Sequence, residues 1–266
     1  MLDVFEIILN LAIALFIGGV LFVAGLEVTL TQVFEPMKDA GLVARALLAN
    51  LIAVPLITYG MSQIYPLERP YMIGLLLYGF AAGAPYTPKL VGAAGGHVPN
   101  SIAATMLLTV LTILYMPLLL PVLIPGTEIE IWEIAKPLLI QMFAPLVLGL
   151  AVRHASKAWA ERLRRPANLL VNLSALVFLV LALVLHWDEL MDTLGTGAMS
   201  SAVVLTLAAF GVGYALGPGR MRGRTTLGLI TTARNIGAAA TIATSNFGEE
   251  PRAVSYTHLT LPTTPY

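Results

Sequence analysis

The sequence predicts an all-α polytopic membrane protein with an inverted repeat and two crossing, discontinuous helices. Three observations support this prediction. First, 58% of the 266 residues are hydrophobic and 11% are charged, with a mean hydropathy of +0.83, whereas soluble domains carry roughly 25% charged residues. Second, apolar runs close to the ~20 residues that a helix needs to cross a bilayer recur along the whole chain. Third, an eight-residue pattern occurs twice, each time inside an apolar run.

Eight apolar runs are expected to cross the membrane. In chain order they cover residues 4–28, 42–64, 71–94, 98–124, 131–152, 167–186, 200–216 and 226–247. Glycine and proline interrupt the third run at 82–88, and polar residues interrupt the eighth at 231–235, so both are expected to be broken helices. The first run is expected to be a retained helix, because Asp3 and Glu6 stand where a signal peptide carries basic residues.

The charges in the connections predict the orientation of the chain. The connection after the fifth run is strongly basic, and so is the one at 220–224, whereas the connections at 128–133 and 188–192 are acidic. Short basic loops remain in the cytoplasm. We therefore expect a protein of the cell inner (plasma) membrane, surrounded by lipid, with its amino terminus outside.

The repeated octet predicts internal symmetry. Residues 87–94 and 232–239 both fit Thr-x-(Lys/Arg)-x-(Val/Ile)-Gly-Ala-Ala, and they lie in the third and eighth runs. Because the eighth run comes five spans after the third, an odd offset, their helices cross the membrane in opposite directions, as in the inverted repeats of many secondary transporters. The alternative is a chance recurrence in a chain rich in alanine and glycine.

The octets place two cations, Lys89 and Arg234, well inside apolar runs. Charges inside a membrane are rare and usually functional. These two could brace backbone carbonyls that the helix breaks expose, or bind an anionic substrate, and the roles are compatible. Thr87, Thr232 and Asn235 are polar neighbours of the two cations and complete the candidate substrate and crossover set.

Other classes of site are not predicted. No Asp or Glu lies in the middle of a run, there are no cysteines, and the histidines do not cluster, so we expect neither catalytic residues nor a metal centre. The net charge of zero gives no reason to expect nucleic acid. Ser101, Thr105, Thr109 and Thr112 share one helical face, which either packs against a neighbouring helix or lines a cavity.

The end of the chain does not fit the pattern of spans. Residues 255–266 contain two prolines and a histidine and resemble a translated adapter sequence. We expect an artefactual tail and a natural chain that continues after about Val254 with a ninth helix. A short polar tail is the alternative.

These features together resemble the bile acid:sodium symporter family and its bacterial relatives. The resemblance rests on Gly-Leu-Glu-Val-Thr-Leu at 25–30, on the break at 82–88 and on Arg-Asn-Ile-Gly at 234–237, and it covers about residues 5–254. It implies a single transporter domain, 1–254, made of two parts. A panel would comprise about 4–28 and 131–186, and a core about 42–124 and 200–254.

The resemblance also implies where ions and substrate would bind. Asn50, Ser101 and Thr105 match positions of the family's sodium sites, whereas Thr87 and Pro88 replace a Ser-Asn pair, Ile230 replaces a Glu and Arg234 replaces a Gln. Two added cations and a lost carboxylate oppose Na⁺ binding by Coulomb repulsion. The resemblance therefore implies a secondary transporter of small organic anions by alternating access, without a resident cofactor.

The coupling of this transport is left open between several alternatives. With Lys89 and Arg234 in the sodium-site region, coupling would be to H⁺ through Lys89, or absent. One alternative is a Na⁺-coupled symporter that uses Asn50, Ser101 and Thr105. Another is a membrane receptor that binds a ligand without transporting it.

Overall fold

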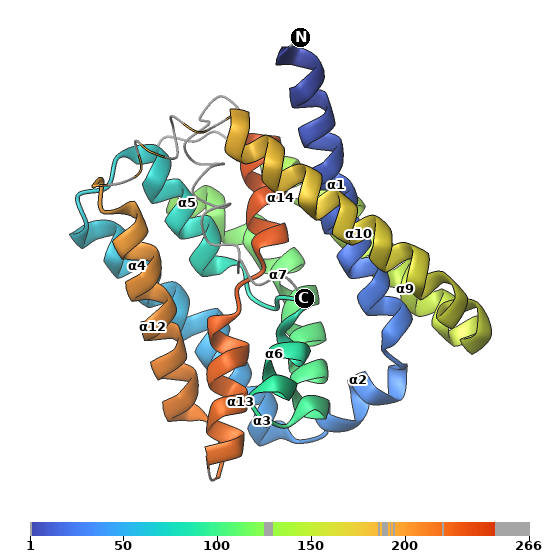
Figure 1. Ribbon diagram of the computed structural model, residues 1–266. Helices are drawn as coiled ribbons and strands as arrows, with labels where there is room; N and C mark the ends of the chain where they lie inside the picture. Colours follow the sequence, from blue (N-terminus) through green and yellow to red (C-terminus); the bar gives the residue numbers. More distant parts are fainter. Residues whose placement is uncertain are drawn as a thin grey trace.

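The structure, a computed structural model, is mostly helical and has no strand in the residues that it describes, which are 2–124, 130–185, 187, 191, 193, 195–219 and 221–247 (Figure 1). The expected tail at 255–266 and the expected ninth helix lie outside these residues. The elements are α1 (Leu2–Glu27), α2 (Leu30–Met37), α3 (Ala40–Leu47), η1 (Leu48–Ala53), α4 (Val54–Ile64), α5 (Arg69–Phe80), α6 (Thr87–Ala93), α7 (Val98–Leu123), α8 (Ile131–Leu138), η2 (Leu139–Phe143), α9 (Ala144–Ala155), α10 (Lys157–Leu185), α12 (Ala198–Leu216), α13 (Met221–Thr232) and α14 (Ile236–Asn246).

The protein is a multi-pass membrane protein. Six helical segments among the described residues are long and apolar enough to cross a bilayer: Ile7–Glu27, Ala40–Ile64, Val98–Leu123, Ile131–Ala155, Lys157–Leu185 and Ala198–Leu216. The outer faces of these helices expose large apolar side chains, such as Leu169, Leu173 and Leu176 of α10. A surface this apolar is suited to contact with lipid.

The two remaining spans are the ones expected to be broken. Residues 81–86 separate α5 from α6, and residues 233–235 separate α13 from α14. The breaks at 82–88 and 231–235 are therefore confirmed in position to within a few residues. All eight expected runs thus correspond to helical segments.

Two helical features differ from the expectation. The helix α2 follows the first span, and a capping box stabilises its start, because Gln32 N donates to Thr29 Oγ1 at 3.3 Å and Thr29 N donates to Gln32 Oε1 at 2.9 Å. The helix α10 begins ten residues before the expected 167, with Trp159 N donating to Ser156 Oγ at its start. In both places local capping by polar side chains, which an apolar pattern does not report, sets the helix start.

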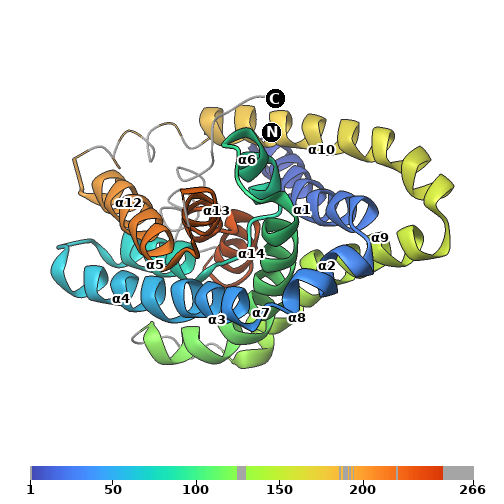
Figure 2. The same ribbon diagram turned by 90° about the horizontal axis from the view of Figure 1, so that it is seen from below.

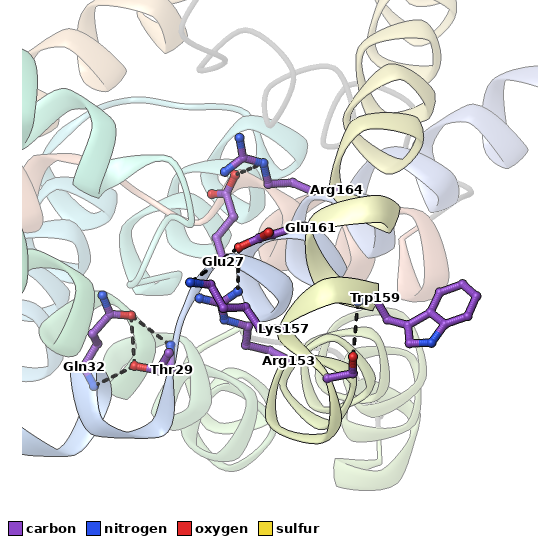
Figure 3. A network of polar contacts seen from close by, with 9 residues as sticks. Glu27, Thr29, Gln32, Arg153, Lys157, Trp159, Glu161 and Arg164 are labelled. Atoms are coloured by element: carbon purple, nitrogen blue, oxygen red, sulfur yellow. Dashed lines mark hydrogen bonds and ion pairs between the residues drawn. The ribbon is translucent and has the colours of Figure 1, made fainter.

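The helices α1, α9 and α10 pack on one another and form a layer on one side of the molecule, opposite α4, α5, α12 and α13 (Figures 1 and 2). We call these three helices the α1 layer. Glycines allow backbone contact within it, because a Cβ on Gly149 would lie 2.2 Å from Phe22 O and one on Gly25 would lie 2.5 Å from Leu146 O. Ion pairs join the same helices at one end, with Glu27 to Arg164 at 3.9 Å and Glu161 to Arg153 at 3.9 Å (Figure 3).

An apolar core joins the α1 layer to the broken helices. Ile13, Ile17 and Leu21 of α1 belong to the same buried cluster as Phe80 of α5 and Ala239 of α14. Ile17 lies directly against the second break, since a Cβ on Gly237 would be 3.3 Å from its Cγ2. The two breaks are therefore packed between the layer and the rest of the bundle.

Candidate functional site

The two helix breaks meet and are joined by Asn235. Its backbone N–H donates to Ala81 O at 2.8 Å, and its side-chain Nδ2 donates to Gly83 O at 3.2 Å. Its Oδ1 accepts from Ala238 N at 3.1 Å, which caps the start of α14. One asparagine thus satisfies groups of both breaks, and the two broken spans contact each other where the sequence predicts a crossover.

Threonine side chains complete the hydrogen bonding of the first break. Thr109 Oγ1 donates to Gly83 O at 2.6 Å, and Thr112 Oγ1 donates to Ala82 O at 3.0 Å and accepts from Ala82 N at 3.1 Å. Thr87 Oγ1 donates to Ala84 O at 2.6 Å. Neutral groups therefore satisfy the backbone that the break exposes, as an apolar environment requires.

Arg234 lies inside the second break and is buried without a partner. The residue is 1% exposed, and neither Nε nor either terminal nitrogen has a hydrogen-bond acceptor among the described residues. Tyr78, Tyr86 and Tyr115 lie close enough to interact electrostatically with the guanidinium, and the Tyr115 hydroxyl has no hydrogen-bond partner in the described part of the chain. Since Arg234 makes no bond to a carbonyl here, the structure does not support the bracing role for it.

Lys89 lies apart from this cluster. Its side chain is exposed on α6, whereas Arg234 is buried, so the two cations do not form one buried cluster. The octets also differ in register, because Thr87 is the first residue of α6, after its break, and Thr232 is the last residue of α13, before its break. The octet match therefore does not align equivalent positions of the two broken spans.

The three residues expected at an ion site are all buried. Asn50 lies in the π-helix η1, where its Nδ2 donates to Ala46 O at 2.9 Å and to Thr231 Oγ1 at 3.3 Å. Asn50 Oδ1, Ser101 Oγ and Thr105 Oγ1 have no hydrogen-bond partner among the described residues. Ile230, where the resemblance implies a carboxylate, is packed in an apolar cluster with alanine and leucine side chains.

The remaining expected site residues fall into two classes. Thr87 and Asn235 use their side chains to hold the breaks, whereas Thr232 Oγ1 is buried with no partner in the part that the structure describes. A pocket of about 50 Å³ lies between α1 and the crossover, lined by Phe16, Ile17, Val20, Leu21, Pro85, Tyr86, Asn235, Ile236 and Gly237. Tyr86 belongs both to the pocket and to the group of tyrosines around Arg234, because it lines the pocket and interacts electrostatically with Arg234.

Sequence reasoning did not find the tyrosines around Arg234. A signal for Tyr115 was present, because it follows Thr112 by three residues and so extends the face of Ser101, Thr105, Thr109 and Thr112. Tyr78 lies on a helix whose other side chains are almost all buried, so periodicity did not single it out. No group of His, Cys, Asp and Glu suited to a metal ion occurs within the described ranges.

Comparison with known proteins decides the family. A model of the Sodium Bile acid symporter family matches residues 12–194, more than half of the chain. The chain belongs to the sodium bile acid symporter family. Members of this family are transporters rather than enzymes. The matched residues of this symporter-family chain include the first break but end before the second break and Arg234.

A relative with a curated description is the probable sodium/metabolite cotransporter BASS3, chloroplastic, of Arabidopsis thaliana. It is 20% identical over 200 residues, which cover 74% of this chain and 46% of the relative. The chain thus spans about half the length of this relative.

Proposed function

We propose that this protein is a secondary transporter of small organic anions that works by alternating access, with Arg234 as the group that binds the anion. The observation that carries the proposal is the buried guanidinium of Arg234, which has no hydrogen-bond or ionic partner among the described residues. Membership of a transporter family supports the general activity.

A bound anion would resolve the unfavourable environment of Arg234. The effective penalty for burying an unpaired ion is on the order of several kcal/mol, and arginine keeps its charge under ordinary conditions. A carboxylate or sulfonate can accept two parallel hydrogen bonds from the planar guanidinium. The unpartnered hydroxyl of Tyr115 can donate a further bond to the same anion.

The pocket beside α1 is the place where we propose that the rest of the substrate binds. One wall comes from Phe16, Ile17 and Val20 of α1 and the other from Tyr86 and Asn235 of the crossover, and the lining is almost entirely apolar. We interpret the α1 layer as the panel and the helices that carry the crossover as the core. Movement of the core against the panel would expose this interface to either side of the membrane in turn. The basic connections would face the cytoplasm of a cell with this protein in its inner membrane, and the amino terminus would be outside.

We propose that Na⁺ does not drive this transport. Ile230 stands in an apolar cluster where the family resemblance implies a carboxylate, and the fixed charge of Arg234 repels a second cation. Lys89 is exposed on α6, so coupling to protons through Lys89 also loses its basis.

Equilibrium binding tests the proposed function without assuming a transport mode. Purified protein is unfolded by heat with pyruvate, benzoate or 2-hydroxyethanesulfonate, and with the corresponding neutral amides, in choline or sodium buffers. We expect at least one anion to raise the unfolding temperature in choline buffer, with no effect of its amide, because ligands that bind the folded state stabilise it. Equal effects of anion and amide, or no effect of any anion, would contradict the proposal.

One observation favours a second candidate, a Na⁺-coupled symporter. Asn50 Oδ1, Ser101 Oγ and Thr105 Oγ1 are buried oxygens without hydrogen-bond partners in the described residues, and such oxygens can coordinate Na⁺. This candidate predicts that Na⁺ alone stabilises the protein relative to choline. It also predicts that Thr105→Val removes that stabilisation.

A further inference from the structure

The buried charge of Arg234 has a consequence for how the binding site can cross the membrane. Of the buried side chains that the structure describes, Arg234 alone carries a charge. The ion pairs of Glu27 and Glu161 join helices of the α1 layer rather than the crossover. No buried carboxylate of the described chain therefore accompanies the guanidinium when the site moves.

The surroundings of the guanidinium make an unpaired charge costly. Its electrostatic neighbours are three tyrosine hydroxyls, which are neutral. In an environment with few polar groups the electrostatic cost of an unpaired charge is much larger than in water. Movement of an empty site through the membrane would carry this cost, because a charge in the middle of a bilayer is unfavourable.

A cation that is part of the protein differs from a transported coupling ion in the charge that remains on the empty carrier. A transported cation dissociates together with the substrate, so the empty carrier that returns across the membrane is free of both charges. The guanidinium of Arg234 is covalently attached and cannot dissociate or lose its proton. With an anion bound, the site at Arg234 is therefore neutral, and without the anion it holds an unpaired positive charge. A carrier for net uptake has to return across the membrane with its site empty, so the unpaired charge of the empty site opposes net uptake.

We propose that this protein is an obligatory exchanger of monovalent organic anions, whose binding site crosses the membrane only when an anion is paired with Arg234. The proposal rests on the proposed function of Arg234 as the anion-binding group. One fixed positive charge is neutralised by one carboxylate or sulfonate, whereas a dianion leaves a net negative charge. Import of one anion therefore accompanies export of another, and the exchange of two monoanions moves no net charge.

Proteoliposomes loaded in two ways test the exchange. One batch contains unlabelled pyruvate or 2-hydroxyethanesulfonate, and the other contains Tris sulfate, and both receive the labelled monoanion outside. We expect initial uptake into the first batch to be faster by at least about tenfold, a ratio that any barrier difference above about 1.4 kcal/mol produces. A membrane potential imposed with potassium and valinomycin should leave this exchange unchanged.

The variants separate the exchange mode from anion binding. Lys89→Gln should retain exchange, because its side chain is exposed on α6 rather than buried with Arg234. Arg234→Gln should lose both binding and exchange, and Arg234→Lys should retain part of both. Equal rates in the two batches, or net uptake driven by a sodium gradient, would overturn obligatory exchange while leaving the anion site intact. Failure of the wild type to bind any of the anions at equilibrium would overturn the proposed function and the exchange together.

Discussion

The backbone N–H of Asn235 donates a 2.8 Å hydrogen bond to the carbonyl oxygen of Ala81, and this bond joins the breaks of two helices that lie far apart in the sequence. The side chain of Asn235 adds a bond to Gly83 O and caps α14. The neutral asparagine and the threonines of α7 hold the crossover, and the side chain of the adjacent Arg234 has no hydrogen-bond partner among the described residues. This division of roles between neighbouring residues is the basis of the proposed anion site.

Asn235→Ala should destabilise the protein strongly. It removes a helix cap, worth about 0.5–2 kcal/mol, and one of the two donors to Gly83 O, worth about a further 0.5–1.5 kcal/mol because Thr109 Oγ1 still donates to that oxygen. We expect a loss of about 1–3.5 kcal/mol in the free energy of unfolding, measured by denaturant titration in detergent with tryptophan fluorescence. Asn246→Ala is the control, because Asn246 makes one local bond, to Ile242 O within its own helix. Equal losses for both variants would contradict the role of Asn235 at the crossover.

Gly83→Ala should prevent correct folding of the first break. Gly83 has φ +80°, and an added Cβ would lie 2.4 Å from Thr109 N. Gly95→Ala separates the two causes, because Gly95 also has a positive φ, +69°, but has no atom within 4 Å of an added Cβ. Backbone strain alone costs about 1–2 kcal/mol, so we expect Gly95→Ala to give a folded protein and Gly83→Ala to give little monodisperse protein on size exclusion. Normal yield and unfolding temperature for Gly83→Ala would refute the steric argument.

Two threonines two turns apart on α7, Thr105 and Thr112, should respond in opposite ways to valine. Thr112→Val leaves both Ala82 N and Ala82 O without their side-chain partner, at about 1–3 kcal/mol for each buried group. Thr105→Val removes a buried hydroxyl that has no partner among the described residues and should be neutral or stabilising in choline buffer. Thermal unfolding of both variants measures the difference. A larger loss for Thr105→Val than for Thr112→Val would show that the assignment of the break's hydrogen bonds is wrong.

Gly149→Ala should weaken the α1 layer. An added Cβ would lie 2.2 Å from Phe22 O, so α1 and α9 would have to separate. Overpacking of this kind costs about 1–3 kcal/mol. Gly211→Ala in α12 is the matched control, since nothing lies within 4 Å of its added Cβ, and it should stabilise the helix by about 0.5–1 kcal/mol. The two variants should shift the unfolding temperature in opposite directions, and a shift in the same direction would contradict the close approach of α1 and α9.

Apolar run lengths and helix-breaking residues were sufficient to predict the eight spans and the two breaks. Bilayer thickness sets the length of a span, and proline and glycine interrupt helices for local steric reasons. The start of α10 at Lys157 and the short helix α2 were not predictable in the same way, because they depend on caps at Ser156 and Thr29 rather than on hydrophobicity.

The candidate site was predictable in part. Arg234, Asn235 and the threonine face of α7 could be found because polar residues in an apolar run are conspicuous. The different environments of Lys89 and Arg234 were not predictable from the octet match, because the octets lie in different register at the two breaks. Side-chain exposure depends on the rotation of α6 against α7 and α13, which the short pattern does not encode.

Calorimetric titration of the anion into three purified proteins tests the central claim most directly. The proteins are the wild type, Arg234→Gln and Lys89→Gln, and the titrants are benzoate and its neutral amide. The buried, unpaired guanidinium of Arg234 predicts that the wild type and Lys89→Gln bind benzoate, that Arg234→Gln does not, and that none binds the amide. The same charge predicts that Arg234→Gln is at least as stable as the wild type without anion, because it removes an unpaired buried ion. Benzoate binding that survives in Arg234→Gln, or that is lost in Lys89→Gln, would contradict the account.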